Sequence, residues 1–208
     1  MRFVYGDVEA VIRAIHGGGS KPTALLGRVK YMQRLGWPPD GAKGQGSKLG
    51  YGLAQLVGMA LAFEMLEMGL PPVRVVRLLR TSWPDACAAV ARGWAQRRAD
   101  RPVLLMLNPG ALAELGTAED AERPTPDSME ATTEGGLLDW VRGDAAGGTA
   151  SCYLIDAGRV ARALRTAIVD RQVATGEDVD EAFVELGEEL FGTKEPLGWK
   201  ALRRRSGE

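Results

Sequence analysis

Apolar residues recur at helical spacing in the first hundred residues, and glycine or proline interrupts the pattern repeatedly. The first helix is predicted over residues 7–15, with Asp7 as its N-cap. Its apolar stripe at i, i+3, i+4 and i+7 consists of Val8, Val11, Ile12 and Ile15. After three glycines, a second helix is predicted over residues 22–35, because Pro22 suits a first helical turn and Gly36 ends the pattern. Its inner face is formed by Leu25, Val29 and Met32.

Three more helices are predicted before residue 98. They cover about residues 53–68, a segment opened by Pro71 and Pro72, and about residues 84–97. Residues 40–50, which lie between the second and third helices, contain four glycines and the two lysines Lys43 and Lys48. This composition predicts a flexible hairpin or loop.

The pattern changes after Pro102. Residues 103–107 form a short apolar run that predicts a buried strand, and residues 152–155 predict a second one. Asp156 is expected to cap a helix with Val160, Leu164 and Ile168 four residues apart, and a last helix is expected over residues 178–191. Residues 112–150 hold nine acidic and two basic side chains and few large apolar ones. We expect this acidic segment to be a loop or partly disordered.

These elements predict a fold in two parts. Residues 1–98 form a mainly α N-terminal domain, and residues 99–208 form a small α+β module that contains the acidic segment. A two-stranded sheet is marginal by itself, so we expect this module to pair with a second copy or to bind a partner or an effector.

Charge is distributed unevenly along a chain whose net charge is only −1. Residues 1–80 carry 11 basic and five acidic side chains, a net charge of +6, whereas residues 81–208 carry 15 basic and 22 acidic side chains, a net charge of −7. A basic half joined to an acidic half indicates a module that binds a polyanion.

The order of the N-terminal elements is that of a winged helix-turn-helix. Two short helices joined by a glycine turn place the second helix in a position to enter a DNA major groove. Its polar face is expected to contact DNA through Lys21, Thr23, Arg28, Lys30, Tyr31 and Arg34. The loop over residues 40–50 would be the wing, with Lys43 and Lys48 on the DNA backbone.

Three segments and one spacing, in the same order along the chain, resemble the MerR-type winged helix-turn-helix regulators over about residues 5–80. The run from Lys30 to Pro39, KYMQRLGWPP, is similar to the end of that family's recognition helix, and Lys48-Leu49-Gly50-Tyr51 is similar to the end of its wing. The spacing from Tyr51 to Gly69 and the run from Gly69 to Leu79, GLPPVRVVRLL, are also similar. The resemblance implies sequence-specific binding to promoter DNA, with Tyr51 among the DNA-contacting residues.

The sequence also departs from this family. Lys30 and Lys48 replace arginines, and the helix after Pro84 is short where the family has a long dimerising helix. The resemblance therefore does not imply a coiled-coil dimer.

Catalytic and metal-binding patterns are absent from the sequence. The single histidine, His16, sits beside three glycines and is expected to be a capping or surface residue, and Cys87 and Cys152 are too far apart for a paired-cysteine metal site. The run from Gly41 to Lys48 has serine before lysine, the reverse of a phosphate-binding loop. We expect no enzyme activity, no cofactor and no metal.

No stretch of the sequence has the length and apolarity of a membrane span or a signal peptide, so a cytoplasmic protein is expected. The predicted function is a sequence-specific, DNA-binding transcriptional regulator with double-stranded DNA as its partner. A homodimer through the second module and a contact with RNA polymerase or a regulatory protein are further expectations. Two alternatives stay open, an excisionase-like protein that bends DNA and a protein-interaction adaptor whose winged helix has lost DNA binding.

Overall fold

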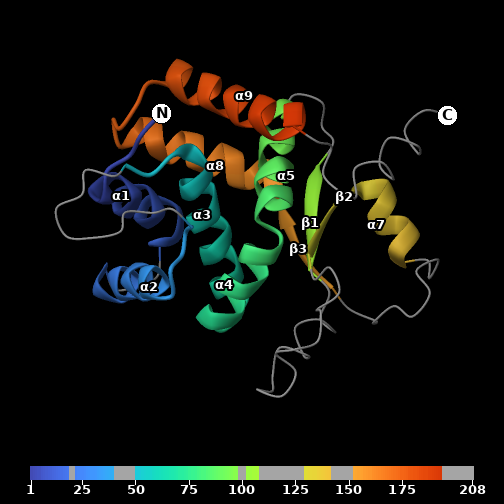
Figure 1. Cartoon of the computed structure of the whole chain (residues 1–208), viewed down its shortest axis with the longest axis horizontal. Helices are drawn as coiled ribbons and strands as arrows, with labels where there is room; N and C mark the ends of the chain where they lie inside the picture. Colours follow the sequence, from blue (N-terminus) through green and yellow to red (C-terminus); the bar gives the residue numbers. More distant parts are fainter. Residues whose placement is uncertain (19–21, 40–49, 98–101, 108–128, 142–151, 194–208) are drawn as a thin grey trace.

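The computed structural model describes residues 1–18, 22–39, 50–97, 102–107, 129–141 and 152–193 (Figure 1). The N-terminal helices are α1 (Tyr5–His16), α2 (Pro22–Arg34), α3 (Leu53–Glu67), α4 (Pro72–Thr81) and α5 (Trp83–Ala95). The remaining elements are β1 (Val103–Leu107), β2 (Met129–Thr133), α7 (Glu134–Val141), β3 (Tyr153–Asp156), α8 (Ala157–Asp170) and α9 (Gly176–Thr193). The described part is therefore mostly helical with one small sheet, as the apolar periodicity predicts.

Local sequence explains most of the helix boundaries. α1 begins at Tyr5, two residues before the predicted start, and the Asp7 carboxylate accepts a hydrogen bond from the Val4 backbone nitrogen at 2.8 Å. Asp7 therefore acts from the third helical position and is not the N-cap. Asp156 caps α8 as predicted, since its carboxylate accepts a hydrogen bond from the Arg159 backbone nitrogen at 2.8 Å.

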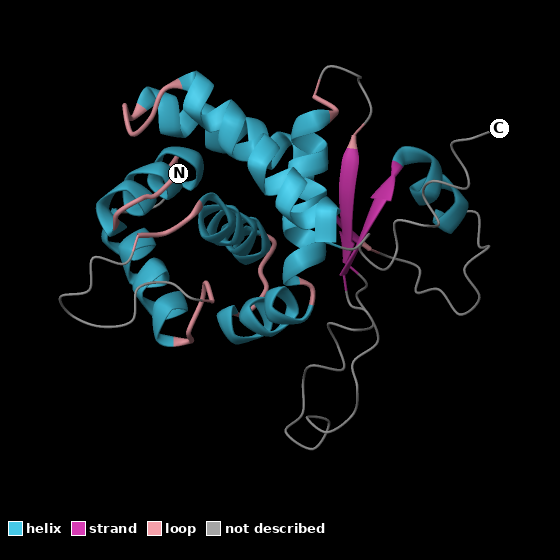
Figure 2. Ribbon diagram, turned by 45° about the horizontal axis from the view of Figure 1, so that its top comes forward, coloured by secondary structure: helices cyan, strands magenta, loops and turns pink. Residues whose placement is uncertain are grey.

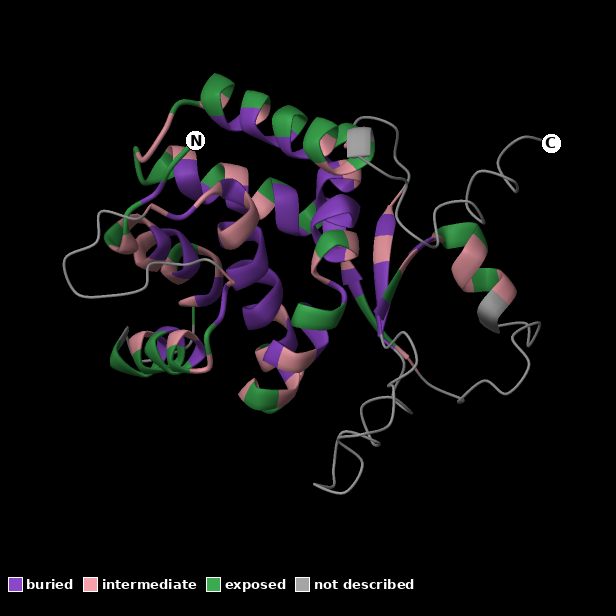
Figure 3. Ribbon diagram, in the orientation of Figure 1, coloured by how far each residue is buried: buried purple, intermediate pink, exposed green. Residues whose placement is uncertain are grey.

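Helix α3 lies at the centre of the helical body. Apolar side chains occur on all of its faces, and most of its residues are buried (Figure 3). A helix that is apolar all round has to be surrounded by other elements. α1, α4, α5, α8 and α9 all contact it, so helices from both halves of the chain cover the same central helix.

The sheet has the strand order β2-β1-β3 and is antiparallel throughout. Leu105 at its centre lies opposite Ala131 of β2 and Ile155 of β3. The strands stand at one side of the helical body, where α5 and α8 contact β1, and α7 lies beyond them against β2 (Figure 2). The small α+β region predicted after residue 102 is thus present, with a third strand added.

Part of the acidic segment 112–150, expected to be a loop, is regular structure. β2 and α7 both fall inside it. The sequence MEATT has only one large apolar residue, Met129, so periodicity gives no strand signal, yet Met129 and Thr132 are buried against the sheet. Pairing with β1, which is apolar at every position, stabilises a strand that its own sequence does not specify.

The boundary expected at residues 98/99 does not separate two hydrophobic cores. One cluster of buried residues runs from Phe3 in the N-terminal part to Leu186 in α9. α5 supplies much of the junction, because it contacts both α8 and α9 and its residues Ala86, Ala88, Ala89 and Ala91 are buried. The two parts predicted from the sequence are therefore packed into a single body over the described residues.

Candidate nucleic-acid interface

Helix α2 turns one apolar face to the core and leaves the opposite face in solvent. Leu25, Val29 and Met32 are at most 3% exposed, as the helical spacing predicts. The exposed side chains include five of the predicted DNA contacts: Thr23, Arg28, Lys30, Tyr31 and Arg34. No acidic residue occurs in α2, so every charged side chain on this face is a cation.

The C-terminal end of α2 is closed by a left-handed glycine. Gly36 has φ = 73°, and its backbone nitrogen donates to the Gln33 carbonyl at 2.9 Å. The Trp37 backbone nitrogen then donates to the Met32 carbonyl at 3.0 Å. These two bonds satisfy carbonyls that a helix end otherwise leaves unpaired. The same closure directs the following chain into the core.

Trp37 fastens this end of α2 to the central helix. Its side chain is buried, and its indole nitrogen donates to the Gly58 carbonyl in α3 at 3.2 Å. Trp83 packs edge-on against it, with ring centroids 5.0 Å apart and an interplanar angle of 89°. A Cβ atom on Gly58 would lie 2.3 Å from the Trp83 ring, so glycine is needed where both indoles meet α3.

Arg80 of α4 provides a second attachment for α2. Its Nη2 atom donates to the Leu35 carbonyl at 2.6 Å and to the Gly36 carbonyl at 3.2 Å. The charged donor neutralises the partial negative charge at the C-terminal end of α2. Arg80 is absent from the residues predicted from the sequence, since its role depends on α4 lying beside α2. The signal that could have identified it is the stripe of arginines at every third residue of α4.

Tyr51 has a structural position that corrects its predicted DNA contact. Its side chain is only 3% exposed, and its hydroxyl oxygen accepts a hydrogen bond from the Gln33 Nε2 atom of α2 at 2.7 Å. Its backbone pairs with Phe3 in an isolated antiparallel bridge, with both N–H···O distances at 2.8 Å. A buried aromatic ring with these partners links α2 to the N-terminal segment and leaves little of the Tyr51 side chain exposed.

Lys21, Lys43 and Lys48 lie outside the described residues, and so do residues 40–49 of the expected wing.

His16 is not the surface or capping residue expected from its neighbouring glycines. It is 8% exposed, it packs against Phe63, and its Nδ1 atom lies 3.0 Å from the Glu67 Oε1 atom. The residue therefore joins the end of α1 to the end of α3.

The described helices separate charge across the molecule. α2 and α4 contact each other and together hold six basic residues and no acidic one. α9 holds seven acidic residues and no basic one. In Figure 1, α9 runs along the top of the molecule and α2 and α4 lie along the bottom. The acidic helix therefore does not cover the cationic face of α2.

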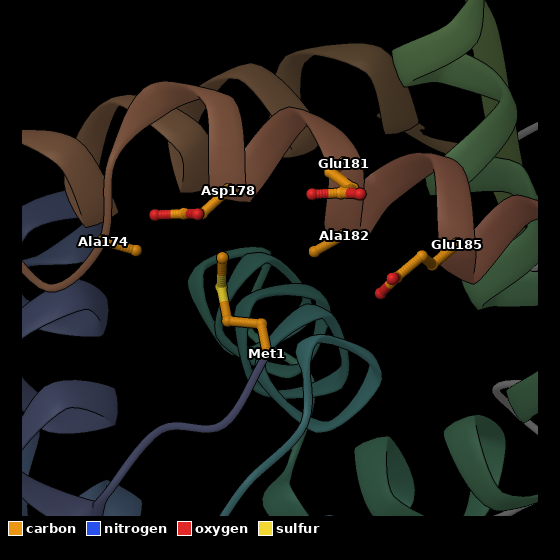
Figure 4. A pocket seen from close by; sticks show the side chains of 6 residues that line it. All are labelled: Met1, Ala174, Asp178, Glu181, Ala182 and Glu185. Atoms are coloured by element: carbon orange, nitrogen blue, oxygen red, sulfur yellow. The ribbon is translucent and has the colours of Figure 1, made fainter.

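A hollow of about 240 Å³ beside α9 shows the character of the acidic side. Asp178, Glu181 and Glu185 project along it, and Met1, Ala174 and Ala182 form its apolar lining (Figure 4). Asp178 already has a local partner, because the Thr175 hydroxyl donates to its carboxylate at 2.6 Å and the Thr175 backbone nitrogen at 3.2 Å. These hydrogen bonds lower the pKa of Asp178 and stabilise the first turn of α9.

Both cysteines are free thiols in the structure. Burial raises the pKa of the Cys87 thiol, with the nearby Glu189 carboxylate adding to the effect, and burial also raises the pKa of Cys152. Elevated pKa values keep both side chains in the weakly nucleophilic thiol form.

Within the described residues, no group of three or more histidine, cysteine or carboxylate side chains is arranged to hold a metal ion. No helix in the same part of the chain is long and apolar enough to cross a membrane. Comparison of the chain with family models, with curated proteins and with solved structures finds no match.

Proposed function

We propose that the protein is a sequence-specific, DNA-binding transcriptional regulator and that α2 is its recognition helix. The observation that carries this proposal is the exposed face of α2, which combines three cations with a tyrosine and a threonine and contains no carboxylate. Long cationic and hydrogen-bonding side chains on one helix face are what contact with phosphates and base edges requires.

The way α2 is held supports this proposal. A recognition helix has to present its side chains in a fixed orientation, and sites built on rigid elements do so more accurately than loops. α2 is fixed by its buried face, by the glycine closure at its end, by Arg80 and by the Gln33–Tyr51 hydrogen bond. These contacts hold α2 along its buried face and at its C-terminal end.

The neighbouring elements support the winged helix-turn-helix part of the proposal. α1 and α2 contact each other and are separated by only five residues, 17–21, which suits two helices joined by a short turn. The antiparallel bridge between Phe3 and Tyr51 pairs the N-terminal segment with the end of the loop where the wing is expected. The wing itself remains an expectation from sequence.

Fluorescence anisotropy with the full chain tests this function. Labelled genomic fragments are titrated at two salt concentrations, first with the wild-type protein and then with a variant carrying Lys30→Gln and Arg34→Gln. Arg171→Gln is the matched control, since Arg171 is an exposed arginine at the end of α8, next to the acidic helix. We expect a few fragments to be enriched, with an affinity that falls steeply with salt because phosphate contacts release counterions.

The two variants should then differ. The α2 variant should lose most of the binding, and the Arg171 control should retain it. Absence of binding at low salt for the wild-type protein would contradict the proposal. Binding that survives the α2 substitutions would remove α2 from the interface, and capture of a protein partner would become the next experiment for an adaptor.

A further inference from the structure

Helix α4 presents a row of arginines beside the proposed recognition helix. Its buried residues are Val75, Val76, Leu78 and Leu79. Arg74, Arg77 and Arg80 recur at every third position, outside that buried set, and no acidic residue occurs in the helix. A second helix whose own sequence carries three cations and no acidic residue therefore contacts α2.

Arg80 is held in place before any ligand arrives. Its Nη2 atom bonds to the Leu35 and Gly36 carbonyls, and within the described residues its Nε and Nη1 atoms have no hydrogen-bond partner. A guanidinium group fixed at one nitrogen keeps its remaining donors in a planar array, which matches the oxygen atoms of a phosphate. Because the side chain is already ordered, less conformational entropy is lost when a phosphate binds.

Gly36 makes this arrangement possible in two ways. Its positive φ of 73° is one that glycine adopts without strain, and a Cβ atom at this position would lie 2.7 Å from the Arg80 Nη2 atom. Any larger residue would push the guanidinium away from the end of α2. The glycine that ends α2 thus also leaves room for an arginine from α4.

Electrostatics gives this arginine a further role in DNA binding. A helix C-terminus carries a partial negative charge, which repels a DNA phosphate approaching the end of α2. Arg80 reverses the sign of the charge there, and Arg34 and Arg77 add two more cations from the end of α2 and from the preceding turn of α4. The end of the recognition helix becomes attractive to phosphate.

We propose that Arg77 and Arg80 of α4 bind adjacent phosphates of the DNA backbone beside the C-terminal end of α2, one phosphate for each arginine. This inference rests on the proposed DNA-binding function and adds a second helix to the interface. α2 would contact the groove, and α4 would bind the backbone next to it. The ligand is the phosphodiester group, so the contact is independent of base sequence.

The test is the salt dependence of binding to a labelled random-sequence duplex of about 30 base pairs, measured with the full chain. Arg77→Gln is the main variant, because no hydrogen bond joins the Arg77 side chain to α2 in the described structure and its loss should leave the fold intact. Arg80→Gln and Arg80→Lys separate charge from the hydrogen bonds to α2. Urea denaturation of each variant checks that it is folded, and Arg171→Gln is again the control.

The slope of log affinity against log salt should decrease by about one for Arg77→Gln and for Arg80→Gln, as expected for one lost phosphate contact each. Arg80→Lys should keep the slope, because the charge remains. An unchanged slope for both glutamine variants, alongside a reduced slope for Lys30→Gln, would overturn the α4 contact and leave α2 as the DNA-binding helix. An equal reduction of the slope in Arg171→Gln would also overturn the α4 contact, because loss of any positive charge would then have the same effect as loss of Arg77 or Arg80. No binding by the wild-type chain would instead reject the DNA-binding function itself.

Discussion

Gly93 of α5 and Gly158 of α8 bring two helices into backbone contact. A Cβ atom on Gly93 would lie 2.5 Å from the Gly158 backbone nitrogen and 2.7 Å from its Cα atom. Since the first of these glycines belongs to the N-terminal helices and the second to the C-terminal part, their contact shows directly how tightly the two parts of the chain are packed together.

Replacing Gly93 by alanine should therefore destabilise the protein. Alanine favours helix by about 1 kcal/mol over glycine, but here the added methyl group meets backbone atoms that cannot rotate away. We expect a net loss of about 2 kcal/mol in the free energy of unfolding, as for other overpacked cores. Urea denaturation followed by circular dichroism measures it.

Gly187→Ala is the matched control for this experiment. Gly187 also lies inside a helix, α9, but a Cβ atom there would be 3.8 Å from the Phe191 ring and 3.9 Å from Ala91, which are ordinary contact distances. This substitution should stabilise the protein slightly. If the two glycines gave the same change, close backbone packing at Gly93 would not be the cause.

Removing residues 99–208 should unfold the N-terminal part. The fragment 1–98 would lack Leu164, Ile168 and Phe183, which are buried in the common core. Burial of each large apolar side chain contributes about 2 kcal/mol, and the whole stability of a domain is about 5–15 kcal/mol. Trp94, stacked on Phe183 with centroids 5.1 Å apart, would also be uncovered.

Thermal denaturation of this fragment is the measurement. We expect no cooperative transition and strong binding of a hydrophobic dye, whereas the full chain should unfold cooperatively. A sharp transition in the fragment, with a midpoint near that of the full chain, would show that residues 1–98 have a sufficient core of their own. For this reason the DNA-binding experiments use the full chain.

Most of the helices were predictable from the sequence because each one is a local pattern, whereas α7 was not, since it falls in the acidic segment expected to be a loop. The spacing of Leu25, Val29 and Met32 identifies the inner face of α2, and Asp156 identifies the start of α8. β2 was not predictable, because its stability comes from pairing with β1 across more than twenty residues of chain. The common core was not predictable either, because it forms by packing between distant segments, which no local pattern encodes.

Part of the candidate interface was likewise predictable from local sequence, and part was not. The cationic face of α2 follows from helical periodicity alone, and the structure leaves all five of its predicted side chains exposed. Tyr51 is predicted to contact DNA because its position resembles the end of a wing, but its ring packs in the core. Arg80 was missed because a residue 45 positions after Leu35 acquires its role only when α4 lies beside α2.

The carboxylate of Asp178 should make the free energy of unfolding depend on pH in the acidic range. Hydrogen bonds from Thr175 lower the pKa of Asp178 in the folded protein. Its contribution to the free energy of unfolding is therefore fully present above its pKa in the unfolded chain, and is lost as the pH falls through its lower pKa in the folded protein. Asp178→Asn should therefore be less stable than the wild type at pH 7, and the difference should shrink as the pH falls below about 4, the ordinary range of an aspartate pKa.

Urea denaturation at several pH values measures this dependence, with Glu177→Gln as the neighbouring control. A difference in the free energy of unfolding between Asp178→Asn and the wild type that stays constant from pH 7 to low pH would contradict the assigned role. Ionisation of Asp178 would then not be the cause of the difference.

Tyr51→Phe should reveal whether this residue supports α2 or contacts DNA. The substitution removes the hydroxyl that accepts a hydrogen bond from Gln33 but leaves the buried ring in place. Loss of one such bond should lower the free energy of unfolding by about 1 kcal/mol. The salt slope of DNA binding should not change, because no phosphate contact is lost. A lower slope in the folded variant would restore Tyr51 to the interface.

The two lysines of the expected wing provide a test of the part of the interface that rests on sequence alone. Lys43→Ala combined with Lys48→Ala should weaken binding to all duplexes equally and reduce the salt slope by roughly two, one for each phosphate contact. Sequence preference should be unchanged, because backbone contacts carry no base information. Anisotropy titrations with a preferred fragment and a random duplex measure both quantities. An unchanged slope would remove the wing from the interface, whereas a changed preference would mean that the loop reads bases and that α2 is not the only source of specificity.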